Sequence, residues 1–139
     1  MSEQGGSGPA PQPARSGAQD DEVRLELPAT PGHVRLARLT VASVASGLGF
    51  SFDAVEDLRI AVDEMCYVLG GEGRPGSITL RFEVDGSALV ITGEGDAGVH
   101  RAEFVELSEQ ILAATVDEYS ITRVDGYVTC RLVRRRELA

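Results

Sequence analysis

The sequence predicts an α+β domain, a two-layer sandwich in which a mixed, mainly antiparallel sheet of about five strands carries three helices on one face. Segments with strand and helix periodicity follow one another in the order strand, helix, helix, strand, strand, helix, strand, strand. Each predicted helix has one apolar stripe, so all three can bury it on the same side of a sheet. Two Asp-Gly pairs, at residues 85–86 and 125–126, predict hairpins and therefore antiparallel neighbours.

The composition is typical of one soluble globular domain with a real core, since 42% of the 139 residues are hydrophobic and 25% are charged. The formal net charge of -9 argues against a direct nucleic-acid partner, because phosphate binding relies on clustered cations. The three consecutive arginines at residues 134–136 are interpreted as a solvated tail. All 13 cations are arginine, which excludes a P-loop lysine and lysine Schiff-base chemistry.

No apolar run approaches the roughly 20 residues of a membrane span, and no secretory signal is evident. We therefore expect a cytoplasmic protein without a membrane partner. Cys66 and Cys130 lie on predicted buried faces and have no Cys or His neighbour at ligand spacing. They are interpreted as small core residues, and no metal site is expected.

The chain divides into a leader and one domain. Residues 1–21 are rich in Gly, Pro, Ser, Ala and Gln and predict a disordered leader, whereas residues 22–138 form the domain. The alternation of apolar and charged residues over 22–27 predicts the first strand, which Pro28 ends. Thr30 as N-cap and Pro31 at the first helical position open the first helix, which glycines close at 47 and 49.

The longest periodic segment, Asp53 to Leu69, predicts the central helix. Asp53 and Glu56 match a capping box, and glycines at 70 and 71 end the helix. Arg59 and Asp63, four residues apart, are spaced to pair on its surface. Seven apolar residues share one face: Ala54, Leu58, Ala61, Val62, Met65, Cys66 and Leu69.

The remaining elements follow from alternation and turn signals. A hairpin is predicted from residues 78–84 and 88–92, followed by a loop from Gly93 to Glu103. The last two strands are predicted at 119–123 and 127–133. Between them and the loop, a third helix at about residues 104–116 is expected to turn five side chains inward: Phe104, Leu107, Ile111, Leu112 and Val116.

Two segments, ARLTVAS at 37–43 and EDLRIAVDEMC at 56–66, resemble the anti-sigma factors of the GHKL (Bergerat, histidine-kinase-like) ATPase superfamily. The similarity is greatest to the actinobacterial stress-type members and covers Val23 to about Leu138. It implies a Bergerat-type fold, binding of an alternative sigma factor, and a competing STAS-type anti-anti-sigma factor. Kinase members phosphorylate a serine of that antagonist with Mg-ATP, and members usually dimerise, so a homodimer is a possible assembly.

The resemblance also implies roles for individual residues. Glu64 corresponds to the acidic residue of the N-box, the catalytic base or water positioner, although an exposed surface carboxylate remains the alternative. Arg38 matches a first-helix arginine that contacts both partners, and Arg35 on the same helix is predicted to bind a partner as well. The segment ITGEGDAG matches the nucleotide-binding loop, with Gly93 at the adenine-reading position, Gly95 retained and Asp96 displaced by three residues. An ordinary loop remains the alternative for this glycine-rich stretch.

Three departures from the family pattern predict a degenerate nucleotide site. Val68 replaces the magnesium-holding asparagine, and valine offers no oxygen to a hard cation. Gly93 replaces the aspartate that reads the adenine amino group, and the lid segment has no glycine after Gly98. Since phosphoryl transfer depends on positioning and metal-assisted charge stabilisation, we expect little catalysis and no cofactor.

Three functions remain open on the sequence. The first is an anti-sigma-factor-like regulator with weak or lost nucleotide binding, which is not an enzyme. The second is an active Mg-ATP-dependent serine kinase that phosphorylates its STAS antagonist and uses another magnesium ligand such as Asp96. The third is a domain whose partner is neither a sigma factor nor a STAS protein.

Overall fold

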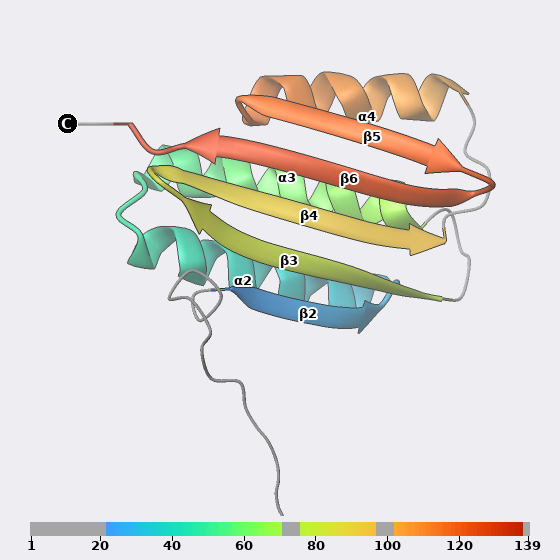
Figure 1. The fold of residues 1–139 in the computed structure, drawn as a ribbon, viewed down its shortest axis with the longest axis horizontal. Helices are drawn as coiled ribbons and strands as arrows, with labels where there is room; N and C mark the ends of the chain where they lie inside the picture. Colours follow the sequence, from blue (N-terminus) through green and yellow to red (C-terminus); the bar gives the residue numbers. More distant parts are fainter. Residues whose placement is uncertain (1–21, 71–75, 97–101, 138–139) are drawn as a thin grey trace, which may run out of the picture.

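The computed structural model describes residues 22–70, 76–96 and 102–137, so the predicted leader at residues 1–21 lies outside the described part. Three helices and five strands follow one another in the predicted order (Figure 1). They are β2 (Val23–Pro28), α2 (Pro31–Gly47), α3 (Phe52–Gly70), β3 (Ser77–Asp85), β4 (Ala88–Asp96), α4 (Ala102–Thr115), β5 (Glu118–Val124) and β6 (Tyr127–Arg135).

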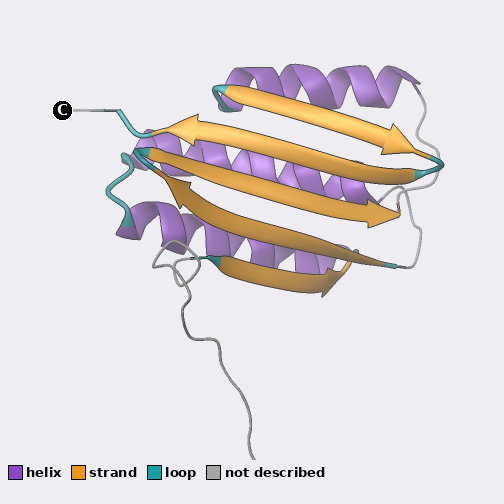
Figure 2. Ribbon diagram, viewed as in Figure 1, coloured by secondary structure: helices purple, strands orange, loops and turns teal. Residues whose placement is uncertain are grey.

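The five strands form one sheet in the order β2-β3-β4-β6-β5, and every neighbouring pair is antiparallel. The three helices lie together on one face of this sheet (Figure 2). Helix α2 lies against β2 and β3, α3 crosses β4 and β6, and α4 lies beside β5. The predicted fold class, a two-layer α+β sandwich, is therefore confirmed.

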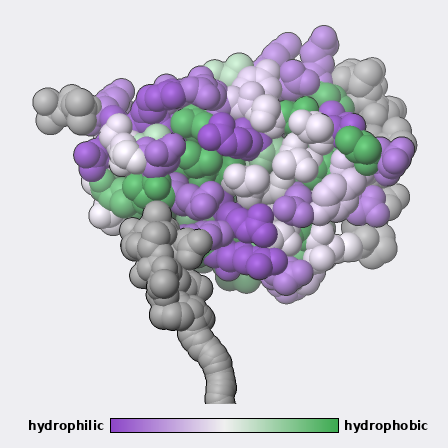
Figure 3. Space-filling view, in the orientation of Figure 1, coloured by the Kyte–Doolittle hydropathy of each residue, from purple (hydrophilic) through white to green (hydrophobic). Residues whose placement is uncertain are grey.

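Figure 3 views the molecule from the strand side, where hydrophilic and hydrophobic residues are both visible on the surface. A small cluster apart from the main core consists of Ala88, Val90 and Val133. The main core lies between sheet and helices because alternate strand residues point toward the helices. Its centre is α3, whose predicted apolar stripe is buried without exception. Within the described ranges, no helix combines the length and apolar character of a membrane-spanning segment.

The predicted starts of α2 and α3 are close to the observed ones, but the capping contacts of these two helices differ from the prediction. Thr30 has the extended N-cap conformation, yet its hydroxyl contacts His33 Nδ1 at 2.8 Å instead of a backbone N–H. The predicted capping box at Asp53 is wrong, because α3 begins at Phe52 and Ser51 Oγ accepts the hydrogen bond of the Ala54 N–H at 3.1 Å. Asp53 then lies in the first turn, where the helix dipole favours a carboxylate.

The loop predicted from Gly93 is also wrong at its start, because β4 continues to Asp96. Gly93 pairs with Leu80 of β3 and Cys130 of β6, so both ladders extend through the glycines. Glycine weakens a strand when considered alone, and here close packing of α3 explains its presence.

The prediction for α4 is confirmed at Leu112 and Val116, which are buried, but is wrong at Leu107. Leu107, expected inside, is 54% exposed, whereas Ser108 is 1% exposed. The buried positions on α4 are 108, 112 and 115, which repeat every three to four residues around Leu112. The side chain of Phe104 lies outside the described part of the chain.

The arginines at residues 134–136 are not a solvated tail. Arg134 Nη1 donates to Asp57 Oδ2 at 2.9 Å and to the Thr115 carbonyl at 2.7 Å. Arg136 Nη1 donates to the Leu48 carbonyl at 2.9 Å. The last strand is thereby tied to α2, α3 and α4, a long-range role that a local charge pattern does not reveal.

Candidate functional site

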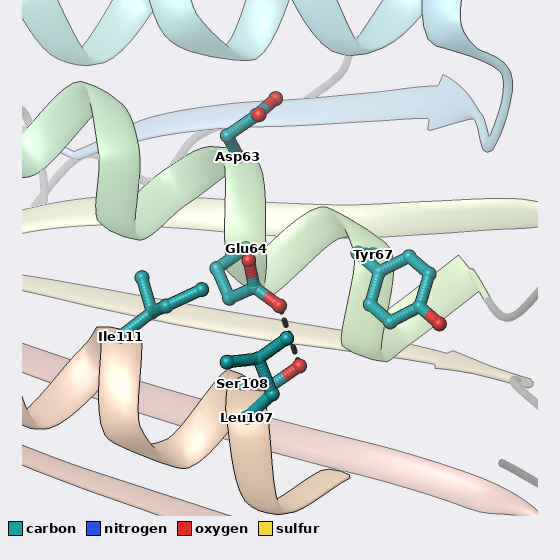
Figure 4. Close-up of a pocket in the computed structure, with 6 residues that line it drawn as sticks. All are labelled: Asp63, Glu64, Tyr67, Leu107, Ser108 and Ile111. Atoms are coloured by element: carbon teal, nitrogen blue, oxygen red, sulfur yellow. Dashed lines mark hydrogen bonds between the residues drawn. The ribbon is translucent and has the colours of Figure 1, made fainter. Parts of the chain in front are cut away.

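A pocket of about 380 Å³ opens between α3 and α4 (Figure 4). Glu64 and Tyr67 of α3 are three residues apart and so lie on the same side of that helix. Leu107, Ser108 and Ile111 of α4 form the opposite wall by the same spacing. The sixth lining residue, Asp63, lies at the edge nearest α2.

Glu64 is the polar centre of this pocket. Its side chain is half-buried and points toward α4, where Ser108 Oγ donates a hydrogen bond to Glu64 Oε2 at 2.5 Å. The Glu64 carboxylate therefore lies in a partly enclosed pocket and is held from α4. Sequence reasoning missed Ser108, although a serine four residues before Leu112 on the buried side of a helix needs a hydrogen-bond partner.

Asp63 points in a different direction from Glu64, toward α2 (Figure 4). Asp63 Oδ1 accepts a hydrogen bond from Arg38 Nη1 at 3.0 Å, so the pair on α3 predicted with Arg59 is wrong. Arg59 instead approaches Glu56 at 3.5 Å. Arg38, one of the two predicted partner-binding residues, remains 34% exposed beside this contact, and Arg35 is exposed on the same helix.

Val68, at the position of the missing asparagine, is 1% exposed and belongs to the hydrophobic core. It is not among the residues that line the pocket at Glu64. A polar side chain at this position would enter apolar surroundings, where an unpartnered amide costs about 1–3 kcal/mol. The position therefore serves packing and offers no oxygen to a cation.

Gly93 and Gly95 lie in β4 beneath the C-terminal end of α3. A Cβ atom on Gly93 would lie 2.5 Å from Leu69 Cδ1, 2.8 Å from Leu80 Cδ2 and 3.1 Å from Met65 Sδ. A Cβ atom on Gly95 would lie 2.8 Å from the Leu69 carbonyl oxygen. Both glycines therefore permit close approach of helix and strand, and an aspartate at position 93 would have to displace the ends of the Leu69, Leu80 and Met65 side chains.

Asp96 ends β4 and is exposed. Strand alternation places it with Glu94 on the face that points away from the helices. On that face Tyr127 donates to Glu94 Oε1 at 2.5 Å, and the negative charge of Asp96 helps to raise the pKa of Tyr127 after the larger effects of Glu94 and burial. The structure thus places Asp96 with Tyr127, across the sheet from Glu64.

The two cysteines face the interior between α3 and β6. Cys66 and Cys130 are both free and buried, and desolvation raises the pKa of each thiol to about 12. A thiol with this pKa is protonated at neutral pH and is a poor nucleophile.

The family pattern places Mg-ATP between the sheet and the helices, and three observations bear on that group. The magnesium position is a buried valine, the adenine position is a glycine packed against Leu69, and Asp96 lies on the other face. The residues at these positions do not fit Mg-ATP, since they supply neither the oxygen ligand nor the adenine-reading carboxylate.

The chain is 33% identical over 107 residues to the serine-protein kinase RsbW of Bacillus licheniformis, covering 72% of this chain and 66% of the relative. It is 33% identical over 106 residues to the RsbW of Bacillus subtilis, with the same coverage of 72% and 66%. The chain thus spans slightly less than two thirds of the length of these relatives. No family model matches the sequence.

A solved structure of similar fold contains the RsbU and RsbW domains of a Mycobacterium tuberculosis protein. It superimposes with a TM-score of 0.60 at 19% identity and covers 83% of this chain and 32% of that chain. At this identity the likeness supports the fold, while the Bacillus relatives carry the assignment of the family. The sequence motifs, the antiparallel sheet with three helices on one face, and these relatives agree that the chain belongs to the RsbW family.

Proposed function

We propose that this protein is an anti-sigma-factor-like regulator that binds an alternative sigma factor, is countered by a STAS-type anti-anti-sigma factor, and has lost useful affinity for nucleotide. The observation that carries the proposal is the packing around Gly93, where Leu69, Leu80 and Met65 occupy the space of an adenine-reading side chain. A member of a kinase family whose core side chains occupy this space keeps the fold but lacks the group that positions the nucleotide for phosphoryl transfer.

The metal position supports the same proposal. Magnesium binds through oxygen ligands in near-octahedral geometry, and Val68 provides none. In phosphoryl transfer the metal and the positioning groups supply most of the catalysis. Glu64 alone, without metal and without a positioned nucleotide, has nothing to activate.

Support for a protein partner comes from the exposed side of α2. Arg35, Leu36, Arg38 and Leu39 form what we call the α2 surface, on which Leu36 is 44% and Leu39 is 58% exposed. Arginines next to exposed apolar side chains are typical of protein interfaces. The net charge of -9 favours encounter with a partner that carries basic segments.

The alternative function is an active Mg-ATP-dependent serine kinase that phosphorylates its STAS antagonist. Its support is Glu64, a half-buried carboxylate that faces a pocket. The position of Asp96 beside Tyr127 weighs against it, because Asp96 was the candidate for the missing magnesium ligand.

Two assays test the proposal. Incubation with a STAS-type antagonist and labelled ATP should leave the antagonist unphosphorylated; phosphoserine that disappears in Glu64→Ala would establish the kinase instead. In a binding assay with the sigma factor recovered by co-purification, Arg38→Ala should weaken binding by about tenfold. The matched change Arg59→Ala, on the exposed side of α3, should leave binding unchanged. Equal affinities for both variants would remove the α2 surface from the account.

A homodimer, which members of the family usually form, is part of the proposal. Sedimentation velocity of the full chain distinguishes a dimer from a monomer.

A further inference from the structure

Among the described residues that line the pocket at Glu64, no cation balances the two carboxylates. Arg38 pairs with Asp63, which points toward α2, whereas the contact made to Glu64 is the neutral hydroxyl of Ser108. A carboxylate accepts up to about four hydrogen bonds, so Glu64 retains capacity for a further donor.

The walls around this carboxylate are apolar and aromatic. Tyr67 lies on one side, and Ile111 and the 54% exposed Leu107 lie on the other. A volume of about 380 Å³ is at the lower end of the range of about 300–1,000 Å³ for ligand pockets. An acidic group inside a small apolar pocket suits an occupant with an apolar stem and a cationic end.

The pocket also adjoins the α2 surface. Asp63 lines the edge of the pocket and bonds Arg38 of that surface at 3.0 Å. A protein bound to the α2 surface would therefore extend to the mouth of the pocket along one continuous surface. This continuity favours a side chain of a protein over a free small molecule.

We propose that the pocket receives an arginine side chain of the protein partner. Its guanidinium pairs with the Glu64 carboxylate and stacks on Tyr67, while its methylene stem packs against Leu107 and Ile111. Arginine fits better than lysine because its planar fork can bond a carboxylate through two N–H groups and stack on an aromatic ring at the same time. This inference rests on the proposed function, in which no nucleotide competes for the site.

The test is a titration of the full chain, labelled with ¹⁵N, with Nα-acetyl-arginine amide, followed by NMR amide shifts. Nα-acetyl-citrulline amide, which has nearly the same shape without the charge, and Nα-acetyl-lysine amide are the matched ligands. We expect saturable shifts at residues 64, 67, 107, 108 and 111 with the arginine derivative. Glu64→Gln keeps an acceptor for Ser108 and should weaken this binding by at least about fivefold, a loss of about 1 kcal/mol. Glu106→Gln, an exposed position of α4, should leave it unchanged.

Equal shifts with citrulline, shifts spread over the acidic surface, or full affinity in Glu64→Gln would overturn the proposal. Lysine binding as tight as arginine binding would overturn the assignment of a guanidinium. A calorimetric titration with Mg-ATP on the same sample separates the two proposals. Failure of arginine to bind together with absence of ATP binding refutes the arginine pocket alone, whereas ATP binding refutes the loss of the nucleotide site.

Discussion

Helix α3 meets its neighbours in two different ways. Along β4 the contact is close: a Cβ atom on Gly95 would meet the Leu69 carbonyl oxygen, and one on Gly93 would meet the ends of the Leu69 and Leu80 side chains. Along α4 the same helix leaves a pocket of about 380 Å³ with Glu64 inside it. The inner contact, which we call the α3–β4 seam, contains the position where the family reads adenine, and the outer one is the α3–α4 pocket.

Under the proposed function, this difference is the structural basis for the loss of nucleotide affinity. The α3–β4 seam is closely packed, with glycine at positions 93 and 95. The α3–α4 pocket is not closely packed and keeps its acidic residue. Gly93 and Glu64 both belong to motifs of the family, but Gly93 lies in the packed core whereas Glu64 lines a pocket.

The largest expected effect comes from forcing the seam open. Gly93→Asp places a carboxylate against Leu69 and Leu80, and we expect a loss of about 3–5 kcal/mol in the free energy of unfolding. The measurement is urea denaturation. Gly32→Asp is the matched control, since a side chain at Gly32 meets nothing within 4 Å and lies in the first turn of α2. Wild-type stability of Gly93→Asp would mean that the seam can hold the family's aspartate.

Alkaline pH tests whether the interior beneath α3 excludes water. The pKa of Cys66 and of Cys130 is raised from 9.0 to about 12, so above pH 9 the unfolded chain releases protons that the folded chain keeps. Stability should be complete below pH 9 and fall as the pH rises, by about 1.4 kcal/mol per thiol at pH 10. The double variant Cys66→Ala, Cys130→Ala should show a shallower fall in denaturation midpoint. An unchanged pH profile would show that the thiols are hydrated.

The contacts of Arg134 are expected to hold α4, one wall of the pocket, in place. Arg134, whose side chain is 15% exposed, bonds Asp57 of α3 and the last turn of α4, so Arg134→Met should cost about 2 kcal/mol. Arg131→Met, at an exposed position of the same strand, is the control and should change stability by less than about 0.5 kcal/mol. Equal effects of the two changes would mean that Arg134 does not hold α4 in place.

The smallest effect is expected inside the pocket. Ser108→Ala removes the hydrogen bond to Glu64 and should lower stability by about 1 kcal/mol. Ser46→Ala, an exposed change in α2, corrects for the helix propensity of alanine. If thermal denaturation gives the two variants the same midpoint, the contact between Ser108 and Glu64 contributes no stability.

Local pattern was enough to predict most of the fold. The stripe on α3 and the Asp-Gly hairpins depend on residues close in sequence, and Asp125 and Gly126 have the positive φ values of 52° and 83° that a type I′ turn requires. Long-range contacts explain the errors. The extension of β4 through Gly93 depends on α3, the orientation of Ser108 depends on Glu64, and the contacts of Arg134 join segments 77 residues apart.

The candidate site was predictable only in part, because its motifs are local in sequence whereas the surroundings of each residue depend on long-range packing. Its motif residues can be located in the sequence, but whether Val68 faces a ligand or the core depends on the packing of the helix against the sheet. Asp96, named as a substitute magnesium ligand under the kinase alternative, lies on the opposite face of the sheet because of strand alternation.

The central claim is that the closed α3–β4 seam leaves no useful affinity for nucleotide. Isothermal titration of the full chain with Mg-ATP tests it directly, with circular dichroism on the same sample to establish that the protein is folded. We expect no heat beyond dilution up to about 1 mM nucleotide, which corresponds to a binding free energy weaker than about -4 kcal/mol. Saturable binding in the low micromolar range would contradict it.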